Sequence, residues 1–187
     1  MDELHLQTKG ITRTELTRKF LHGLEINNAL EIGSNVGAAL LILSELGFEN
    51  LYGIEINPYA IDISKDNTKG KDIYIIKGSA LDVPYKDLFF DLVFTNGVLI
   101  HISPDDINTV LDEIYRCSKR YIWGYEYYSD KYTMINYRGE DNLLWKADFA
   151  KLYLERYKDL KLVKEERLTY VEHPEYIDAM FLLEKRE

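Results

Sequence analysis

Glycines and carboxylates follow the predicted strands at several points of this sequence. Two glycines bracket a short turn, Gly33 to Gly37, directly after an apolar run. Glycine lacks the Cβ that would block a close approach, and a helix start offers unpaired N–H groups, so such a turn predicts a ligand site. Glu55 ends the next apolar run, and each of its oxygens can accept a hydroxyl hydrogen. Taken alone, a glutamate at a strand end is more often a helix cap or a solvated group, but together with the turn Glu55 predicts binding of a ribose diol.

A histidine is the best candidate for a general base. His101 lies just after the fourth predicted strand, where an acceptor molecule would sit. The ordinary pKa of histidine, about 6.5, makes it a workable proton acceptor near neutral pH. The alternative is that His101 supports a helix N-terminus as a structural group. His5, His22 and His173 have no comparable placement and are expected at the surface.

Aromatic and charged side chains near the fifth predicted strand are candidates for substrate binding. Glu126, Tyr127 and Tyr128 end that strand and are expected to face an acceptor pocket, because an aromatic wall with one carboxylate suits a sugar or an amine. The alternative is an aromatic strand that fills the core. Arg138 could hold a carboxylate or phosphate with its fork of donors, or pair with the acidic residues that follow it.

Strands that alternate with helices position these residues. Parallel sheets built from right-handed βαβ units are typical of this alternation, which holds from residue 28 to about residue 126. Strands are predicted at 28–32, 51–56, 73–77, 90–95 and 120–126, and helices at 38–46, from Asn57-Pro58 and from Ser103-Pro104. In an open sheet of this kind ligands bind outside the carboxyl ends of the strands, which is where the candidate residues fall.

The two ends of the chain differ from this alternating part. Thr12 and Glu15 have the spacing of a capping box and predict an N-terminal helix, within residues 1–27, that could also cover the ligand site. Residues 127–146 have no clean period and predict an inserted loop on the substrate side. A helix at 147–157 and strands at 160–167 and 177–185 then predict an antiparallel hairpin at the sheet edge. Residues 1–187 are therefore expected to form a single domain.

Composition narrows the partners. The chain has 187 residues and a net charge of −9, so a phosphate backbone would be repelled over most of its surface and no nucleic-acid partner is expected. No apolar run reaches the roughly 20 residues of a membrane span, and the N-terminus lacks the basic and apolar regions of a signal peptide. The single cysteine, Cys117, is expected in the core and fits a reducing cytoplasm.

The turn itself distinguishes between nucleoside ligands. A nicotinamide-binding turn reads G-x-G-x-x-G, in which the middle glycine makes room for a pyrophosphate. Here Asn35 stands in that place. Asn35 tolerates a left-handed backbone, so the tight turn is kept, but a nucleoside ligand without phosphates fits better.

These motifs together resemble the class I S-adenosylmethionine-dependent methyltransferases over residues 28–126. The resemblance is carried by Glu31-x-Gly33-x-x-x-Gly37, the acid at position 55, Gly78-Ser79-Ala80 and Asn96-Gly97. It implies a single-domain α/β, Rossmann-like fold with a mainly parallel seven-stranded sheet, an antiparallel C-terminal edge hairpin and helices on both faces.

A narrower resemblance extends nearly to the C-terminus. The chain is similar to the methylases associated with pseudaminic acid biosynthesis, whose substrate assignment rests on association. The matching segments are Asn96 to Ile102, Ser118 to Ile122, Glu126-Tyr127-Tyr128, Tyr137-Arg138-Gly139, Leu144 to Ala150 and Phe181 to Lys185.

The resemblance also implies roles for single residues. Gly33, Ser34, Asn35 and Gly37 would hold the methionine portion of S-adenosylmethionine, and Glu31 would orient its amino group. Glu55 would bind the ribose and Ile56 would pack on the adenine. Ser79 stands where many relatives have Asp, so the Ala80 backbone would read the ring. Asn96 and Gly97 would line the methionine side.

The leading hypothesis is therefore a cytoplasmic methyltransferase that uses S-adenosylmethionine on a small polar acceptor, such as a sugar or nucleotide-sugar intermediate. Methyl transfer is an in-line displacement that needs alignment, exclusion of water and removal of a proton, with no metal. The alternatives are a non-catalytic nucleoside-binding module of the same fold and a nicotinamide-dependent oxidoreductase. The sequence does not predict an oligomeric state.

Overall fold

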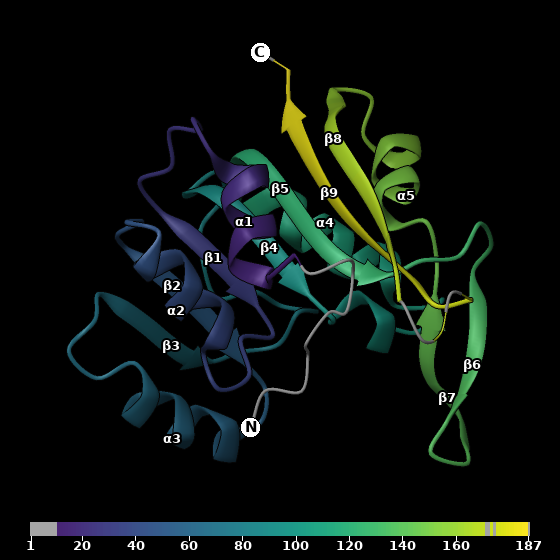
Figure 1. Cartoon of the computed structure of the whole chain (residues 1–187), viewed down its shortest axis with the longest axis horizontal. Helices are drawn as coiled ribbons and strands as arrows, with labels where there is room; N and C mark the ends of the chain where they lie inside the picture. Colours follow the sequence, from purple (N-terminus) through teal and green to yellow (C-terminus); the bar gives the residue numbers. More distant parts are fainter. Residues whose placement is uncertain (1–10, 171–172, 174, 187) are drawn as a thin grey trace.

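A seven-stranded sheet forms the centre of the computed structural model, which describes residues 11–170, 173 and 175–186 (Figure 1). The strand order is β3-β2-β1-β4-β5-β9-β8. The strands of this sheet are β1 (Ala29–Ile32), β2 (Leu51–Glu55), β3 (Ile73–Lys77), β4 (Phe90–Asn96), β5 (Ser118–Tyr127), β8 (Leu160–Thr169) and β9 (Ile177–Lys185). The helices are α1 (Arg13–Leu21), α2 (Ala38–Glu45), α3 (Pro58–Asn67), α4 (Ile107–Cys117) and α5 (Phe149–Arg156), with a short 3₁₀ helix η1 (Leu99–His101).

The sheet has a parallel part and an antiparallel edge. β1 pairs in parallel with β2 and β4, β3 pairs in parallel with β2, and β5 pairs in parallel with β4. β9 runs antiparallel to both β5 and β8. The strand order reverses between β1 and β4, and in such sheets this is the place where a ligand crevice forms at the carboxyl ends. The predicted fold class, including the edge hairpin, is confirmed.

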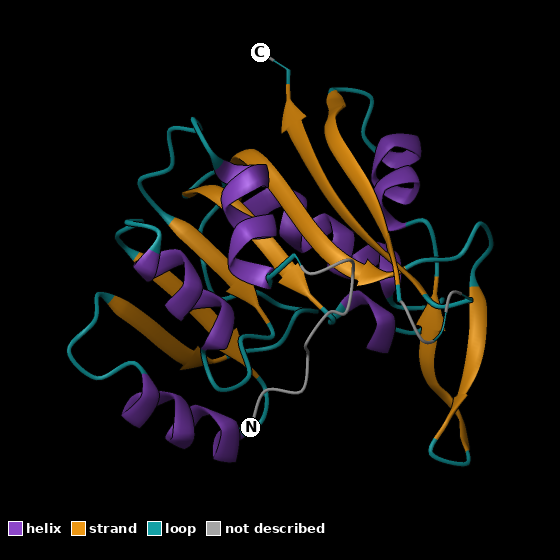
Figure 2. Ribbon diagram, viewed as in Figure 1, coloured by secondary structure: helices purple, strands orange, loops and turns teal. Residues whose placement is uncertain are grey.

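Helices cover both faces of the sheet (Figure 2). One apolar cluster joins α1 and α2 to the sheet, and a second cluster joins α4 and α5 to the opposite face. Because the central strands β1 and β4 contribute side chains to both clusters, they are buried on both sides, as is typical of a parallel sheet between helix layers.

Side-chain caps begin two of the helices as the sequence predicts. The backbone N–H of Thr12 donates to Glu15 Oε2 over 2.7 Å, and the N–H of Glu15 donates to Thr12 Oγ1 over 3.2 Å. This reciprocal capping box begins α1. Asn57 Oδ1 accepts from the N–H of Tyr59 over 3.0 Å and caps α3. These bonds satisfy N–H groups that have no partner inside a helix.

Two segments differ from the sequence-based expectation. The insert at 127–146, expected as a loop, contains a separate antiparallel hairpin of β6 (Thr133–Tyr137) and β7 (Glu140–Lys146). Most residues of these strands are exposed, apart from Leu144 and Trp145, so the sequence shows no clean alternation. The helix expected from Ser103-Pro104 begins at Ile107, after a turn in which the N–H of Asp106 donates to Ser103 Oγ over 3.2 Å.

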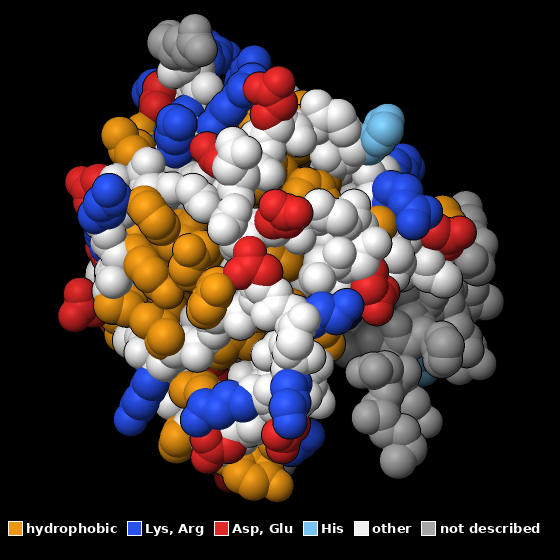
Figure 3. Space-filling model, turned by 90° about the vertical axis from the view of Figure 1, so that its left-hand side faces the viewer, with side chains coloured by type: hydrophobic (Ala, Val, Ile, Leu, Met, Phe, Trp, Pro, Cys, Tyr) orange, Lys and Arg blue, Asp and Glu red, His pale blue; other side chains and the backbone are white. Residues whose placement is uncertain are grey.

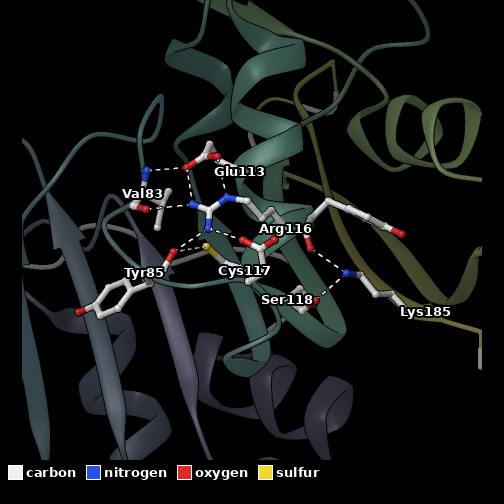
Figure 4. Close-up of polar contacts among 9 residues, drawn as sticks. Val83, Tyr85, Glu113, Arg116, Cys117, Ser118 and Lys185 are labelled. Carbon is white, nitrogen blue, oxygen red and sulfur yellow. Dashed lines mark hydrogen bonds and ion pairs between the residues drawn. The ribbon is translucent and has the colours of Figure 1, made fainter.

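Arg116 fixes the segment between β3 and β4 (Figure 4). Its guanidinium donates to the carbonyl oxygens of Val83 and Tyr85 over 3.0 and 2.6 Å, and to Oδ1 of Asp87 over 2.8 Å. Glu113, one turn earlier on α4, pairs with the same guanidinium over 2.7 Å. This connection has no helix of its own, and α4 therefore supplies the donors that order it.

The end of α4 is held in a similar way. Lys185 Nζ donates to the carbonyl oxygens of Tyr115 and Ser118 over 2.7 and 2.6 Å (Figure 4). The helix dipole also makes a positive charge favourable at this C-terminal end of α4. Cys117 is fully buried, as expected, and burial raises the pKa of its thiol to about 11.

The surface at the β3 edge is partly apolar. Tyr74 and Ile76 of β3 are exposed, and Figure 3 shows apolar side chains gathered on this side of the molecule. Within the described residues, no helix is both long and apolar enough to cross a membrane.

Candidate functional site

The turn after β1 adopts the left-handed backbone that the sequence predicts. Gly33, Asn35 and Gly37 all have positive φ, at 69°, 47° and 83°. A Cβ on Gly33 would lie 2.6 Å from a methyl of Val98, so glycine lets this turn meet the loop after β4. A Cβ on Gly37 would meet Thr68 and Ile75 at 3.0 and 3.1 Å, so this glycine lets α2 begin against α3 and β3.

Glu55 joins the turn to the next helix. One of its oxygens, Oε2, accepts from the N–H of Asn35 over 2.8 Å, and the other, Oε1, accepts from the N–H of Asn57 over 2.8 Å. The side chain therefore combines the two roles that the sequence left open, since it supports α3 and also lines a cavity. Each carboxylate oxygen has two acceptor sites, so one on each oxygen remains for a ligand hydroxyl.

A cavity of about 490 Å³ opens at the carboxyl ends of β1, β2, β3 and β4. We call it the carboxyl-edge cavity, and its size lies within the usual range for small-molecule sites. The predicted cofactor residues that line it are Gly33, Asn35, Glu55, Ile56, Ser79, Ala80, Asn96 and Gly97, and the predicted base His101 lines it too. The lining residues that were not predicted are Ile54, Asn57, Ala60, Gly78, Leu81, Val98 and Ile102.

Three of the predicted cofactor residues do not line this cavity. Gly37 lies at the start of α2, and Ser34 and Glu31 are buried, each 3% exposed. The backbone N–H of Ser34 donates to the carbonyl of Ile54 over 2.9 Å, which ties the turn to β2. Their roles toward a ligand remain predictions.

Glu31 carries a buried oxygen with no partner. Its Oε2 accepts no hydrogen bond. Burial raises the pKa of this carboxyl to about 8, while the positive charge of Arg13 acts in the opposite direction and Glu55 adds to the increase. An unpartnered buried acid at the end of a central strand costs free energy in the ligand-free protein, which points to a binding role.

Glu126 holds the loop after β4. Its carboxylate is buried and accepts from the N–H groups of Val98 and Ile100 over 3.2 and 3.4 Å. Burial raises its pKa to about 7, although hydrogen bonds from Thr95 and the loop backbone lower it in part. Glu126 thus holds the loop Asn96–His101 through its backbone N–H groups. It does not line the carboxyl-edge cavity, and its expected contact with an acceptor stays a prediction.

The insert hairpin positions His101. The Nδ1 atom of His101 lies 3.0 Å from the carbonyl oxygen of Leu143 in β7, and the ring packs edge-on against Tyr137 of β6. Because a carbonyl only accepts, Nδ1 carries the proton in this contact, and Nε2 of the neutral ring keeps its lone pair. The sequence could not predict this contact between residues so far apart in the chain.

The other predicted substrate residues lie outside the carboxyl-edge cavity. Tyr127 is half-buried, and Lys146 Nζ lies 5.8 Å from its ring centroid. Tyr128 is covered by the guanidinium of Arg167 at 3.5 Å and bonds to Asp130. These tyrosines pack against cations of β7 and β8 at the same end of the sheet.

Arg138 lies at the exposed tip of the insert hairpin. Its guanidinium lies 5.1 Å from the ring centroid of Tyr137. Nearby, Asp141 accepts from Asn136 over 2.9 Å. Neither expectation for Arg138, as an anion clamp or as a partner of the following acids, is tested by this position.

Two histidines lie at the surface, and a second cavity opens elsewhere in the molecule. His22 and His173 are exposed, as expected, and His5 lies outside the described residues. A cavity of about 1090 Å³ opens near the start of β4 and β5, at the end of these strands away from the carboxyl-edge cavity. Its charged side chains include Arg116 and Lys119. It contains none of the predicted site residues.

Part of the chain is similar to known methyltransferases. Residues 30–121 match the family model described as a methyltransferase domain. Phosphoethanolamine N-methyltransferase of Plasmodium falciparum is 21% identical over 170 residues, which make up 89% of this chain and 57% of that protein. Ribosomal protein L11 methyltransferase of Clostridium perfringens is 31% identical over 88 residues, 44% of this chain and 28% of that protein. The chain thus spans less than two thirds of the length of either relative.

A solved structure extends the likeness to the whole fold. The 1,6-didemethyltoxoflavin-N1-methyltransferase of Burkholderia thailandensis, with 1,6-didemethyltoxoflavin and S-adenosylhomocysteine bound, matches with a TM-score of 0.73 and 16% identity. The match covers 93% of this chain and 76% of that chain. The narrower resemblance to methylases associated with pseudaminic acid biosynthesis stays a prediction.

Replacement of Glu31 tests the cost of its burial. Because the folded protein raises the pKa of Glu31 to about 8, its carboxyl is protonated more readily when folded than when unfolded, and the stability of the protein falls as the pH rises between about 5 and 8. Glu31→Gln should therefore raise the free energy of unfolding of the ligand-free protein by up to about 3 kcal/mol at pH 7 and by less than about 1 kcal/mol at pH 5. Urea denaturation at both pH values measures this, with the exposed Glu49→Gln as the control. If Glu31→Gln changed the free energy of unfolding equally at the two pH values, the raised pKa of Glu31 in the folded protein would be contradicted.

The tautomer of His101 tests its contact with the insert hairpin. At a pH where the ring is neutral, ¹H–¹⁵N correlation spectra should show the proton on Nδ1, because the carbonyl of Leu143 accepts it. The exposed His22 serves as the internal reference. A proton on Nε2 of His101 would show that the contact does not form in solution.

Proposed function

We propose that the protein transfers the methyl group of S-adenosylmethionine to a small polar acceptor; the match of residues 30–121 to the family model of a methyltransferase domain supports this. The family match and the fold shared with S-adenosylmethionine-dependent methyltransferases support the predicted enzyme class and methyl donor. The activity of the whole protein, its acceptor and its partners are part of the proposal.

The observation that carries the proposal is the meeting of four strand ends around one cavity. The carboxyl-edge cavity brings Glu55 of β2, the Gly33–Asn35 turn of β1, and Asn96-Gly97 of β4 together. Its volume suits a nucleoside, and Glu55 retains acceptor sites for a ribose diol. The unpartnered Oε2 of Glu31 fits the positive amino group that S-adenosylmethionine carries.

The proposed roles of the lining residues follow their positions. Glu55 binds the ribose hydroxyls, and Ile56, which is largely exposed beside the cavity, packs on the adenine. Ser79 Oγ accepts from the N–H of Leu81 over 3.1 Å, so its hydroxyl already supports its own turn and the backbone of Ala80 reads the ring edge. Asn96 and Gly97 line the methionine side, with the backbone of Ser34 and Asn35 and the turn that ends at Gly37.

The first turn also favours this donor over a nicotinamide cofactor. Asn35 occupies the middle position of the turn, where a Cβ narrows the space for a pyrophosphate. Its N–H is used by Glu55 and so is not free for a phosphate oxygen. A nicotinamide-dependent oxidoreductase is therefore disfavoured.

His101 favours an enzyme over a non-catalytic binding module. S-adenosylmethionine, when bound, supplies a methyl group on a positively charged sulfur. The chain has to align the acceptor, exclude water and take a proton, and alignment alone can supply about 7–11 kcal/mol by the intramolecular analogy. His101 lines the cavity, and its Nε2 is the atom that receives the acceptor's proton.

The acceptor is proposed to bind between the carboxyl-edge cavity and the insert hairpin. Glu126, Tyr127 and Tyr128 lie at the end of β5, Arg138 lies in the turn between β6 and β7, and phenolic groups, a cation and a carboxylate suit a polar acceptor. From the sequence resemblance, a sugar or nucleotide sugar is the first candidate. The name of one relative adds phosphoethanolamine as a second. The cytoplasmic location and the absence of a nucleic-acid partner remain predictions.

Calorimetric titration tests the donor. We expect heat from S-adenosylmethionine and S-adenosylhomocysteine and none from the reduced nicotinamide cofactors. Glu55→Gln should weaken the binding of both ligands more than tenfold, because the amide has one accepting oxygen, and its NH2 group would face one of the N–H groups of Asn35 and Asn57 instead of accepting from it. Asp62→Asn, an exposed acid on α3, is the control. Binding of a nicotinamide cofactor without heat from S-adenosylmethionine would contradict the proposal.

Turnover tests the role of His101. With methyl-labelled S-adenosylmethionine and nucleotide sugars or phosphoethanolamine as acceptors, His101→Gln should slow turnover by about 10²- to 10⁴-fold while the affinity for the donor stays near normal. His22→Gln is the matched surface control. A fully active His101→Gln would reduce His101 to a structural role, and donor binding without label transfer to any small molecule of a cell extract would favour the non-catalytic module.

A further inference from the structure

Arg13 places a partly buried cation at the start of α1, on the side of the carboxyl ends of the strands. Its Nε is buried and donates no hydrogen bond. The guanidinium lies 5.6 Å from the ring centroid of Tyr125, which pairs in register with Asn96 of the carboxyl-edge cavity. Arg13 is therefore next to the strand ends that line the cavity.

Glu31 faces the same side of the sheet as Tyr125. In the register of the parallel strands Glu31 pairs with Phe94, and Phe94 pairs with Trp123. Paired residues of neighbouring strands point to the same face, and so does Tyr125, two residues after Trp123. Phe94, Trp123 and Tyr125 all belong to the apolar cluster that α1 covers. The carboxylate of Glu31 and the guanidinium of Arg13 thus approach each other between α1 and the sheet.

These two charges influence each other without pairing. The charge of Arg13 counteracts the rise in the pKa of Glu31, so the groups are within electrostatic reach. Neither Arg13 Nε nor Glu31 Oε2 has a hydrogen-bond partner, and no ion pair joins the two side chains within the described part of the chain. A buried acid and a partly buried guanidinium that both lack partners are costly, unless a ligand with one charge of each sign lies between them.

The neighbouring ionisable groups are already engaged. Asp178 Oδ2 accepts from the phenols of Tyr125 and Tyr170 over 2.6 and 2.7 Å. Lys146 Nζ lies over the ring of Tyr176 at 4.7 Å. Arg13 therefore lies within electrostatic reach of two acids, Asp178 and Glu31, and of these it is Glu31 that has an oxygen without a partner.

We propose that Arg13 binds the α-carboxylate of the amino-acid tail of S-adenosylmethionine while Glu31 binds its α-ammonium. This inference rests on the proposed function, and it assigns Arg13 a binding role that the sequence did not predict. The pair would select ligands that carry an amino-acid tail, because a guanidinium and a carboxylate form strong charge-assisted hydrogen bonds in a partly buried site. It also gives α1 a part in the ligand site.

Two ligands that differ only in the carboxylate test the assignment. Dissociation constants of S-adenosylmethionine and decarboxylated S-adenosylmethionine are measured by calorimetry for the wild-type protein, Arg13→Met, Arg13→Lys and the control Arg18→Met. Arg18 lies on the same helix and is exposed. Wild-type protein should bind S-adenosylmethionine at least tenfold more tightly than the decarboxylated ligand. Arg13→Met should remove most of this preference, with less than twofold change for the decarboxylated ligand, Arg13→Lys should retain part of it, and Arg18→Met all of it.

Different results of this titration would contradict the role of Arg13 and the proposed use of S-adenosylmethionine. Equal affinity of the wild-type protein for the two ligands would overturn the role of Arg13 without any variant. An equal loss of both ligands in Arg13→Met, with an unchanged preference in Arg13→Lys, would make Arg13 a structural group. Absence of binding of both ligands to the wild-type protein would instead contradict the proposed function.

Discussion

Buried carboxylates that accept backbone N–H groups hold the carboxyl edge of this sheet in shape. Glu55 binds the N–H groups of Asn35 and Asn57, and Glu126 binds those of Val98 and Ile100. Loops at strand ends have few backbone partners of their own, so these side chains decide where the turns lie. The cavity depends on them because its walls are these turns. Glu31 is the exception, since its buried Oε2 binds no donor of the protein.

The sequence predicts the sheet well because the sheet depends on local patterns. Apolar runs, the capping residues Thr12 and Asn57, and the turn at Gly33 act over a few residues and can be identified without the fold. The edge hairpin of β8 and β9 follows from the same patterns. The hairpin of β6 and β7 could not be predicted in this way, since most of its residues are exposed and its buried side chains, Leu144 and Trp145, lie next to each other in the sequence.

In the site, too, local features were predicted and contacts between distant segments were not. Most of the predicted cofactor residues line one cavity, because each of them follows a strand whose end could be recognised. Contacts between distant segments were missed: the bond of His101 to Leu143, the anchoring of the β4 loop by Glu126, and the approach of Arg13 to Glu31. The orphaned charges of Arg13 and Glu31 become visible only when burial and hydrogen bonds are known.

We expect Oε2 of Glu31 to remain unpartnered until a ligand supplies a positive charge. Counting the protons released on binding tests it most directly, by titrating S-adenosylhomocysteine at pH 7 in buffers with different ionisation enthalpies. Because the pKa of Glu31 is raised to about 8 in the ligand-free protein, we expect release of close to one proton by the wild-type protein and of almost none by Glu31→Gln. Binding by the wild-type protein without proton release would contradict the account.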